Sequence, residues 1–207
     1  MPRQIDSEQR KREIAAALWR VIERQGMAAI SVRSVAAEAG WSPGSVRYYF
    51  PSQPDLVRFA MELMLERVTT RIRTLWWQTI DAPDPIAATV AVLEEGLPLD
   101  AARATELHIW RAAHNLARAE PSLAEAALAE WQSARYLMRL IVGRLGLSAA
   151  TPEFAAPLPE PAETEAALLQ IFWDGLSQDA TAFPAHYDPA TIRHLLRTYL
   201  EQLRRRA

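Results

Sequence analysis

The chain has 207 residues, is 50% hydrophobic and 23% charged, and carries a net charge of −2, all ordinary for a globular protein. Its longest apolar runs fall short of the roughly 20 residues that a membrane span needs, and its polar N-terminus has no signal-peptide core. It has no cysteine, which excludes disulfides and thiol chemistry. These features predict a cytoplasmic protein that makes no membrane contact.

The charge is unevenly distributed along the chain. Residues 1–50 carry eight basic and five acidic side chains, a balance of +3, so the remaining residues carry −5. A basic segment on an acidic body favours a segment that contacts a polyanion such as nucleic acid. A solvated surface without a partner is the alternative.

Glycine is scarce, alanine and leucine are abundant, and no stretch alternates as a strand would, so we expect an all-α fold. Asp6 and Gln9 have the spacing of a capping box and begin a first helix. Gly26 follows that helix where a left-handed residue is expected, and Gly40 ends the next helix in the same way. Ser42 caps a third helix. These helices are expected over residues 6–24, 31–39 and 42–49.

A longer helix is expected over 54–80, where the proline-containing segment 81–85 ends it. Residues 148–161 contain four prolines and are expected to form a loop. The chain therefore divides near residue 52. Three short helices occupy 1–52, and a bundle of longer helices occupies 53–207. The further helices are expected over 85–96, 100–119, 121–146, 161–179 and 189–205.

Residues 31–50 read SVRSVAAEAGWSPGSVRYYF, which fits two short helices that cross at a steep angle. Ala36 is small at the point where the second helix crosses most closely. Gly40 can adopt the positive φ that the turn needs. Val35 and Val46 are placed to fill the space between the helices. The pattern predicts a helix-turn-helix whose second helix enters the major groove of DNA.

Polar and aromatic side chains cluster around this motif. Hydroxyl, amide and guanidinium groups are the groups that contact phosphates and base edges. A plain helical hairpin would also favour an alanine and a turn glycine, but it would need neither this cluster nor the basic first helix. We therefore predict DNA contacts at Arg33, Ser42, Ser45, Arg47, Tyr48, Tyr49 and Gln53.

The sequence Gly40-Trp-Ser-Pro-Gly-Ser-Val-Arg-Tyr-Tyr-Phe50, followed by Leu56, resembles the DNA-binding signature of TetR-type repressors. The order of elements also matches, since a long helix precedes the motif and a long connecting helix follows it. Gln53 stands where the family commonly has a lysine, and Arg47 stands where a tyrosine is common. The resemblance implies a DNA-binding transcriptional repressor with its helix-turn-helix domain over 1–52.

The C-terminal part resembles the betaine-repressor-like branch of the same family. The resemblance implies a ligand-sensing and dimerisation domain over 53–207, with dimerisation through the last two helices. The matching segments are Glu106-Leu-His-Ile-Trp110, Glu120-Pro121, Trp131 and Trp173-Asp-Gly-Leu176.

The helices expected over 161–179 and 189–205 are more apolar than surface helices need to be, so a second copy of the chain is expected to pack on them. One recognition helix reads only a few base pairs. A homodimer is therefore expected to bind a double-stranded palindromic operator. The apolar positions are Leu168, Leu169, Phe172, Leu176, Ile192, Leu195, Leu196, Tyr199 and Leu203.

Aromatic side chains in the body are candidates for a ligand pocket, because small-molecule sites are mostly apolar with a few placed polar groups. Core packing is the alternative for each of them. Aromatic cages can hold quaternary ammonium groups, but the sequence does not identify the small-molecule effector. A ligand that tilts the helix over 54–80 would change the spacing of two recognition helices and release DNA. The candidate wall residues are Trp76, Trp110, His114, Trp131 and Trp173.

Catalysis has no support in the sequence. No His-x-x-x-His or Glu-x-x-His pair exists, and no glycine-rich phosphate loop is present, so we expect no enzyme, no metal and no cofactor. A helical interaction module without DNA binding is the alternative, and only residues 31–50 argue against it. Arg67 and Arg71 lie one helical turn apart and are expected on a solvated face; pairing with an anionic ligand or an acidic helix is the alternative.

Overall fold

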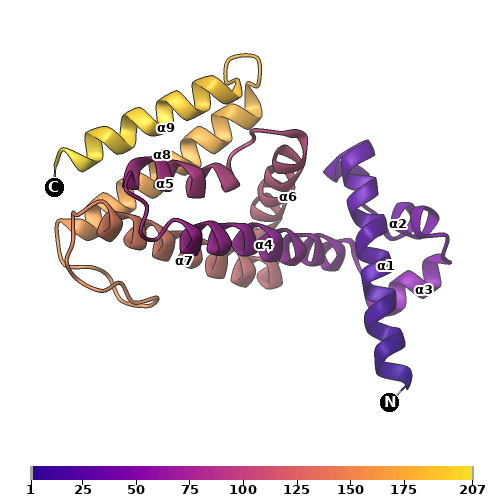
Figure 1. Cartoon of the computed structure of the whole chain (residues 1–207). Helices are drawn as coiled ribbons and strands as arrows, with labels where there is room; N and C mark the ends of the chain where they lie inside the picture. The colour runs from indigo at the N-terminus through magenta and orange to yellow at the C-terminus, as the bar shows by residue number, and fades with distance from the viewer. Residues whose placement is uncertain (1, 207) are drawn as a thin grey trace. The chain divides into compact units, whose positions relative to one another are not determined.

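The computed structural model describes the backbone of residues 2–206 and the side chains of residues 9–121 and 123–206. Over this range the chain forms nine α-helices, two single-turn 3-10 helices and no strand, which confirms the all-α prediction (Figure 1). The α-helices are α1 (Pro2–Gln25), α2 (Val32–Ala39), α3 (Pro43–Tyr49), α4 (Gln53–Gln78), α5 (Pro85–Leu93), α6 (Ala101–Ala117), α7 (Pro121–Arg144), α8 (Ala162–Ala182) and α9 (Pro189–Arg204), and the 3-10 helices are η1 (Met27–Ala29) and η2 (Glu94–Gly96).

The helices gather into two compact units. Unit 1 comprises the described residues up to Arg67 together with His108–Ala127, and unit 2 comprises Val68–Leu107 together with the described residues from Leu128 onward. Helices α4, α6 and α7 each contribute residues to both units. The division at residue 52 concerns function rather than compactness, and it stays a prediction.

Most helix ends lie where the local sequence signals place them. Gly40 has the left-handed conformation that was predicted, with φ 71° and ψ 28°, whereas Gly26 has the positive φ of 78° but an extended ψ of 173°. Prolines begin α3, α5, α7 and α9, where the missing backbone N–H costs nothing. The first helix is the exception: it begins at Pro2 and not at Asp6, because a proline is equally compatible with the first helical turn.

Unit 1 is built around the apolar face of α1. Ile14, Leu18 and Ile22 are at most 4% exposed and share the helix face that packs against α2. Glu38 on α2 adds a polar link, because it accepts a hydrogen bond from Arg20 of α1 at 2.6 Å. That hydrogen bond holds the pKa of the Glu38 carboxyl below its ordinary value.

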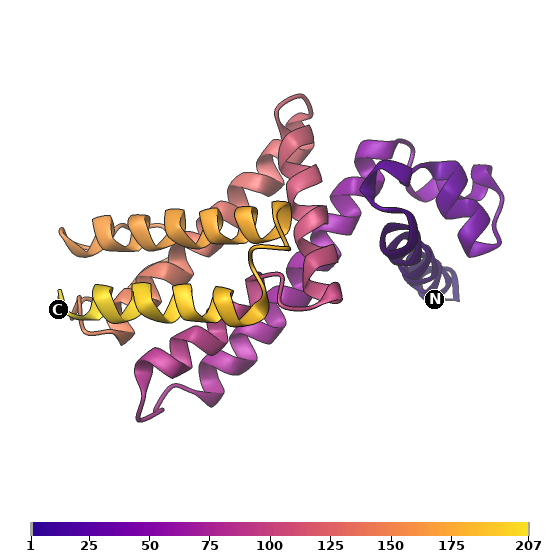
Figure 2. The same cartoon turned by 90° about the horizontal axis from the view of Figure 1, so that it is seen from above.

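Unit 2 has a continuous apolar core to which helices α5, α7, α8 and α9 contribute. Trp173 of α8 is fixed within it, because its indole Nε1 donates a hydrogen bond to the carbonyl oxygen of Leu93 at 3.0 Å. The ring lies so close to Gly96 that a Cβ atom at that position would come within 2.2 Å of it. Helices α8 and α9 lie side by side, and the rings of Phe172 and Tyr199 stack between them with centroids 4.0 Å apart (Figure 2).

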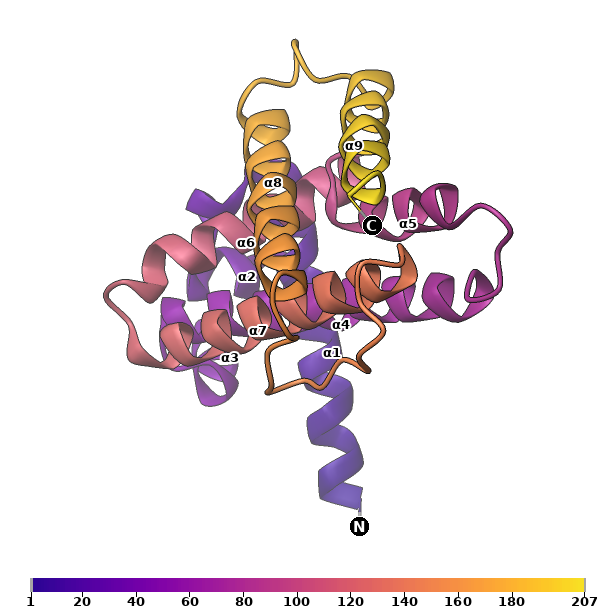
Figure 3. The ribbon, with the colours of Figure 1, turned by 90° about the vertical axis from the view of Figure 1, so that its left-hand side faces the viewer.

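The loop between α7 and α8, drawn in orange in Figure 3, is the proline-rich loop that was predicted. One carboxylate anchors it. Glu163 accepts hydrogen bonds from Arg139 at 2.8 and 2.9 Å, from Arg135 at 3.2 Å, and from the backbone N–H of Leu158 at 2.9 Å. The hydrogen bonds from Arg139 are the main reason that the pKa of Glu163 falls to about 2.

We expect the variant Glu163→Gln to lose about 2 kcal/mol of stability at pH 7, because it removes charged hydrogen bonds to two arginines. The folded pKa is depressed, so the contribution of Glu163 is complete above its ordinary pKa and is lost as the pH falls toward about 2. Urea unfolding at pH 7, 4 and 2.5 measures this. The exposed Glu153→Gln is the matched control; equal stabilities of the two variants at pH 7 would contradict the assignment.

Candidate nucleic-acid interface and effector residues

The turn between α2 and α3 is determined by local hydrogen bonds and packing. The left-handed Gly40 lets the N–H of Trp41 reach back to the carbonyl oxygen of Ala36 at 2.9 Å. Val35 and Val46 are fully buried and Ala36 is 1% exposed, so these small or β-branched side chains fill the space between the two helices as predicted. The angle at which α3 leaves α2 is therefore fixed by residues 35–46.

Both short helices have side-chain caps. Ser31 and Ser34 form a capping box, in which each side chain bonds to the backbone N–H of the other at 3.0 Å. Ser42 accepts a hydrogen bond from the N–H of Ser45 at 3.1 Å, and their hydroxyls lie 2.8 Å apart. Pro43 follows as the first helical residue. These caps give α3, only seven residues long, a defined start.

The predicted DNA-contacting residues all belong to unit 1, and they lie at its surface. Tyr48 is 82% exposed. Its ring meets that of Tyr49 edge to face, with centroids 5.1 Å apart. Arg33, Ser42, Ser45, Arg47 and Gln53 are exposed, and Tyr49 is half-buried.

The start of α4 adds a polar turn next to Gln53. Asp55 accepts hydrogen bonds from the hydroxyl of Ser52 at 2.6 Å and from its N–H at 3.0 Å. The hydroxyl bond is the largest cause of a pKa of Asp55 below its ordinary value. The carboxylate of Asp55 is therefore bound within this turn. Gln53, the first residue of α4, has an exposed side chain.

Two of the five predicted effector residues, Trp110 and His114, lie together in unit 1. Their rings are tilted by 33° with centroids 4.0 Å apart, and Nδ1 of His114 lies 3.0 Å from the carbonyl oxygen of Trp110. Both side chains are half-buried. The structure therefore brings this pair into contact, one turn apart on α6.

The other three predicted effector residues lie in unit 2, each with a different partner. The guanidinium of Arg144 lies over the ring of Trp76 in a cation–π contact, with the guanidinium carbon 3.6 Å from the ring centroid. Trp131 is 44% exposed, and the guanidinium carbon of Arg135 lies 5.0 Å from the centroid of its ring. Trp173 makes the core contacts with Leu93 and Gly96 described above. Trp76 and Trp173 both pack against the core of unit 2, and the role of the three residues in effector binding stays a prediction.

Arg71 does not lie on a solvated face, so that expectation is wrong and its alternative, an acidic partner, is correct. It donates hydrogen bonds to Glu95 at 2.6 Å and to Glu106 at 2.6 and 2.9 Å. The carboxylates are 7% and 6% exposed as residues, and Arg103 also binds Glu95. Hydrogen bonding to Glu106, and then to Glu95, raises the pKa of Arg71.

This cluster of two buried carboxylates and two arginines was not predicted as a whole from the sequence, which gave only an acidic helix as one alternative for Arg71. Buried charges survive only when they are paired, so an acidic residue inside an apolar run is a signal worth following. Glu95 follows such a run at residues 85–93. Arg67, in contrast, is exposed, and its guanidinium lies 4.3 Å from the ring centroid of Trp19 in unit 1.

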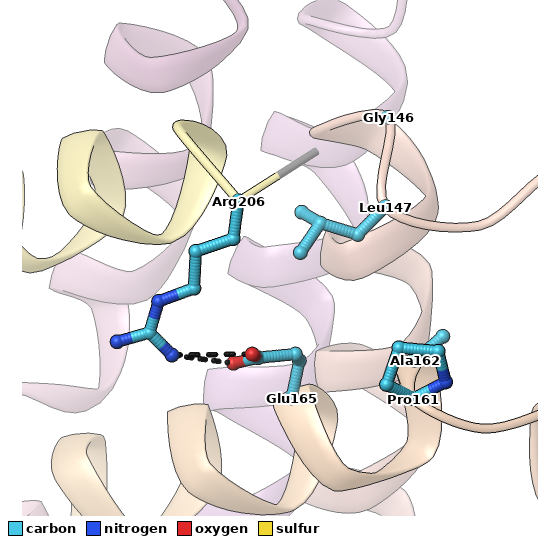
Figure 4. Close-up of a pocket in the computed structure, with 6 residues that line it drawn as sticks. All are labelled: Gly146, Leu147, Pro161, Ala162, Glu165 and Arg206. Carbon is cyan, nitrogen blue, oxygen red and sulfur yellow. Dashed lines mark hydrogen bonds and ion pairs between the residues drawn. The ribbon is translucent and has the colours of Figure 1, made fainter.

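A small cavity of about 110 Å³ lies between the start of α8 and the end of α9 in unit 2 (Figure 4). Its two charged side chains bind each other, because Arg206 donates to both carboxylate oxygens of Glu165 at 3.1 and 3.2 Å. Ligand pockets usually exceed roughly 300 Å³. The cavity is too small, and its charges too fully paired, to be the effector site.

Within the part of the chain that the structure describes, no group of three or more histidine, cysteine, aspartate or glutamate side chains could hold a metal ion. Among the same residues, no helix is both long and apolar enough to span a membrane.

Two family models match the chain. Residues 14–58 match the model of bacterial regulatory proteins of the tetR family, and residues 85–205 match the C-terminal model of BetI-type transcriptional repressors. The chain is also 31% identical over 203 residues to the HTH-type transcriptional regulator PksA of Bacillus subtilis (strain 168), which covers 98% of this chain and 94% of that protein.

Solved structures have the same fold. A transcriptional regulator from Rhodococcus sp. Rha1 is 32% identical with a TM-score of 0.78, and the match covers 95% of this chain and 96% of that one. The multidrug binding protein EbrR, crystallised in complex with proflavin, is 26% identical with a TM-score of 0.61 and coverages of 92% and 99%. These similarities agree with the helix-turn-helix geometry found at residues 31–50.

Proposed function

The chain belongs to the TetR family of bacterial regulatory proteins, and we propose that it is a homodimer that binds a palindromic operator and releases it when an effector binds. Its relatives are DNA-binding transcriptional regulators, so the chain is a DNA-binding regulator and not an enzyme. The observation that carries the proposal is the fixed helix α3 with its exposed polar and aromatic face.

The groups on that face suit the chemistry of duplex DNA. Arg47 can bind phosphate or the O6 and N7 acceptors of guanine, and the hydroxyls of Ser45 and Tyr48 can donate to phosphate oxygens. Buried Val46 holds the inner side of α3 against α2, so the exposed side is presented with little freedom. We assign the DNA contacts to the seven residues predicted from the sequence: Arg33, Ser42, Ser45, Arg47, Tyr48, Tyr49 and Gln53.

The dimer interface is proposed on a stripe of uncharged side chains along α8. Leu168 and Ile171 are 42% and 66% exposed, and Gly175 leaves room for the close approach of another helix. Apolar side chains exposed in a row mark a protein interface more often than a solvated surface. The stripe has the spacing of an exposed helix face: Thr164, Leu168, Ile171, Gly175, Gln178 and Ala182.

Helix α9, which lies beside α8 (Figures 2 and 3), carries a second uncharged stripe. Its exposed or half-buried members are Thr191, Leu195, Thr198 and Gln202. The predicted interface residues Leu169, Leu176, Ile192, Leu196 and Leu203 are instead buried within their own unit. The proposed interface therefore uses the neighbouring, exposed stripe of each helix.

The simplest way to regulate DNA binding is an aromatic effector that binds within residues 53–207. EbrR, at 26% identity, is a multidrug binding protein that was crystallised with proflavin, a flat aromatic cation. Stacked or half-exposed indoles such as Trp110 and Trp131 offer faces to a ligand of this class. Release needs only that the effector binds the DNA-free form more tightly, by about 1–3 kcal/mol.

We expect the wild-type protein to protect one two-fold symmetric site in DNA that flanks its own gene, with affinity falling steeply as salt rises. Arg47→Ala and Tyr48→Ala should each weaken that site by about tenfold or more, because each contact contributes about 1–3 kcal/mol. Arg73→Ala, an exposed arginine in unit 2, is the control and should bind as the wild type does. Absence of any protected site at low salt, with folded protein, would refute DNA binding at this motif.

The wild type should sediment as a dimer at micromolar concentration, and Ile171→Glu should sediment as a monomer. The substitution places two unpaired carboxylates in a two-fold symmetric apolar interface, which costs several kcal/mol. Ile80→Glu, at a residue 45% exposed outside the stripes, is the matched control and should remain dimeric. A dimer that persists in Ile171→Glu would place the interface elsewhere.

We expect proflavin to quench tryptophan fluorescence and to dissociate a fluorescent operator duplex in the same concentration range. Trp110→Ala should shift both curves to higher proflavin concentration, because it removes a stacking face next to His114. Trp77→Ala, at a residue 67% exposed and outside the proposed wall, should shift neither. Saturation by proflavin without any loss of operator affinity would disprove the release mechanism for this ligand class.

A further inference from the structure

A groove in unit 1 adjoins the DNA-binding face but lies partly outside the motif. It is lined by Arg10 and Glu13 of α1, by Trp41 of the turn, and by Ser45 of α3; it is open to solvent and has a volume of about 430 Å³. The α1 residues precede the segment 14–58 that matches the family model. Helix α1 nevertheless continues to Pro2, and in Figure 1 its N-terminal part projects past α3.

Trp41 places the arginine of this groove. The guanidinium carbon of Arg10 lies 5.7 Å from the centroid of the indole ring, within the range of a cation–π contact. The indole in turn contacts Tyr49 with a centroid distance of 6.4 Å, and Tyr49 contacts the exposed Tyr48. Ring contacts therefore link the arginine on α1 to the tyrosines on α3, and the positions of these side chains are not independent.

The chemistry of the groove suits one repeat of a sugar–phosphate backbone. Arg10 supplies a charged donor and Ser45 a hydroxyl donor for phosphate oxygens, and the indole face of Trp41 supplies an apolar surface for a deoxyribose. Glu13 repels phosphate, so it makes one end of the groove unfavourable for the backbone. A groove with an attractive and a repulsive end favours one position of the DNA over its neighbours.

We propose that this groove holds the DNA backbone beside the bases that α3 contacts, with Arg10 as a phosphate ligand, Trp41 as the residue that positions it, and Glu13 as a residue that restricts the register. The proposal rests on the proposed function, since it concerns the same complex with DNA. It extends the interface to a part of α1 that lies before the family motif.

The test measures the affinity of full-length variants for a 40-base-pair duplex selected by the wild type from a random library, and for an unselected duplex, across salt concentrations. Arg10→Ala should weaken both by about tenfold and reduce the salt slope by about 2 per dimer, because one phosphate contact is lost in each subunit. Trp41→Leu should weaken binding in the same direction. The Arg10→Ala/Trp41→Leu double variant should lose less affinity than the sum of the two single losses, because Trp41 also positions Arg10. Glu13→Gln should bind the unselected duplex several-fold more tightly and lower the ratio of selected to unselected affinity.

Arg12→Ala is the matched control, because Arg12 is exposed on the same helix and does not line the groove. It should change affinity by less than twofold. Thermal unfolding of each variant separates loss of contact from loss of fold, and the opposite signs expected for Arg10→Ala and Glu13→Gln cannot both arise from destabilisation. If Arg10→Ala behaves like Arg12→Ala, or if Glu13→Gln weakens binding, the groove is not a backbone site. A wild type that binds neither duplex would instead refute the proposed function itself.

Discussion

One continuous helix supplies residues to both compact units. Helix α4 belongs to unit 1 up to Arg67 and to unit 2 from Val68, and no loop interrupts it there. Each unit holds the helix by an arginine: Arg67 lies over Trp19 in unit 1, and Arg71, one turn later, binds Glu95 in unit 2. The two anchors lie one helical turn apart, and the helix satisfies its backbone hydrogen bonds internally between them.

The two anchors differ in how much they constrain α4. The contact of Arg67 with an indole tolerates sliding, because the face of a ring offers no single acceptor. Arg71 instead neutralises two buried carboxylates, and its removal would leave Glu106 without this arginine and Glu95 with Arg103 alone, in a region from which water is largely excluded. The position of α4 in unit 2 is therefore set by charge as well as by apolar residues such as Ile72 and Leu75, whereas in unit 1 it is set by apolar residues such as Leu56 and Met61.

Sequence patterns predicted the helix-turn-helix because every determinant of that motif lies within a few residues of its partner. Gly40, the cap at Ser42 and the buried Val46 can all be placed by helical geometry alone. The pairing of Arg71 with Glu106 spans 35 residues, and which of many arginines and glutamates meet depends on how the helices pack. The effector residues were selected by type alone, and aromatic type does not distinguish a pocket wall from a structural contact. The contact between Arg10 of α1 and Trp41 of the turn was also not predicted, because it depends on how the helices pack and not on the spacing of the two residues in the sequence.

The contact of Trp173 with Gly96 has a consequence for how this sequence can change over evolutionary time. A methyl group at position 96 would occupy the volume of the indole, and a smaller side chain at position 173 would leave both a void and an unpaired carbonyl at Leu93. A change at either position alone therefore costs stability. In homologous sequences the two positions should therefore covary, with glycine at 96 where a tryptophan stands at 173 and a larger residue at 96 only where the indole has been replaced.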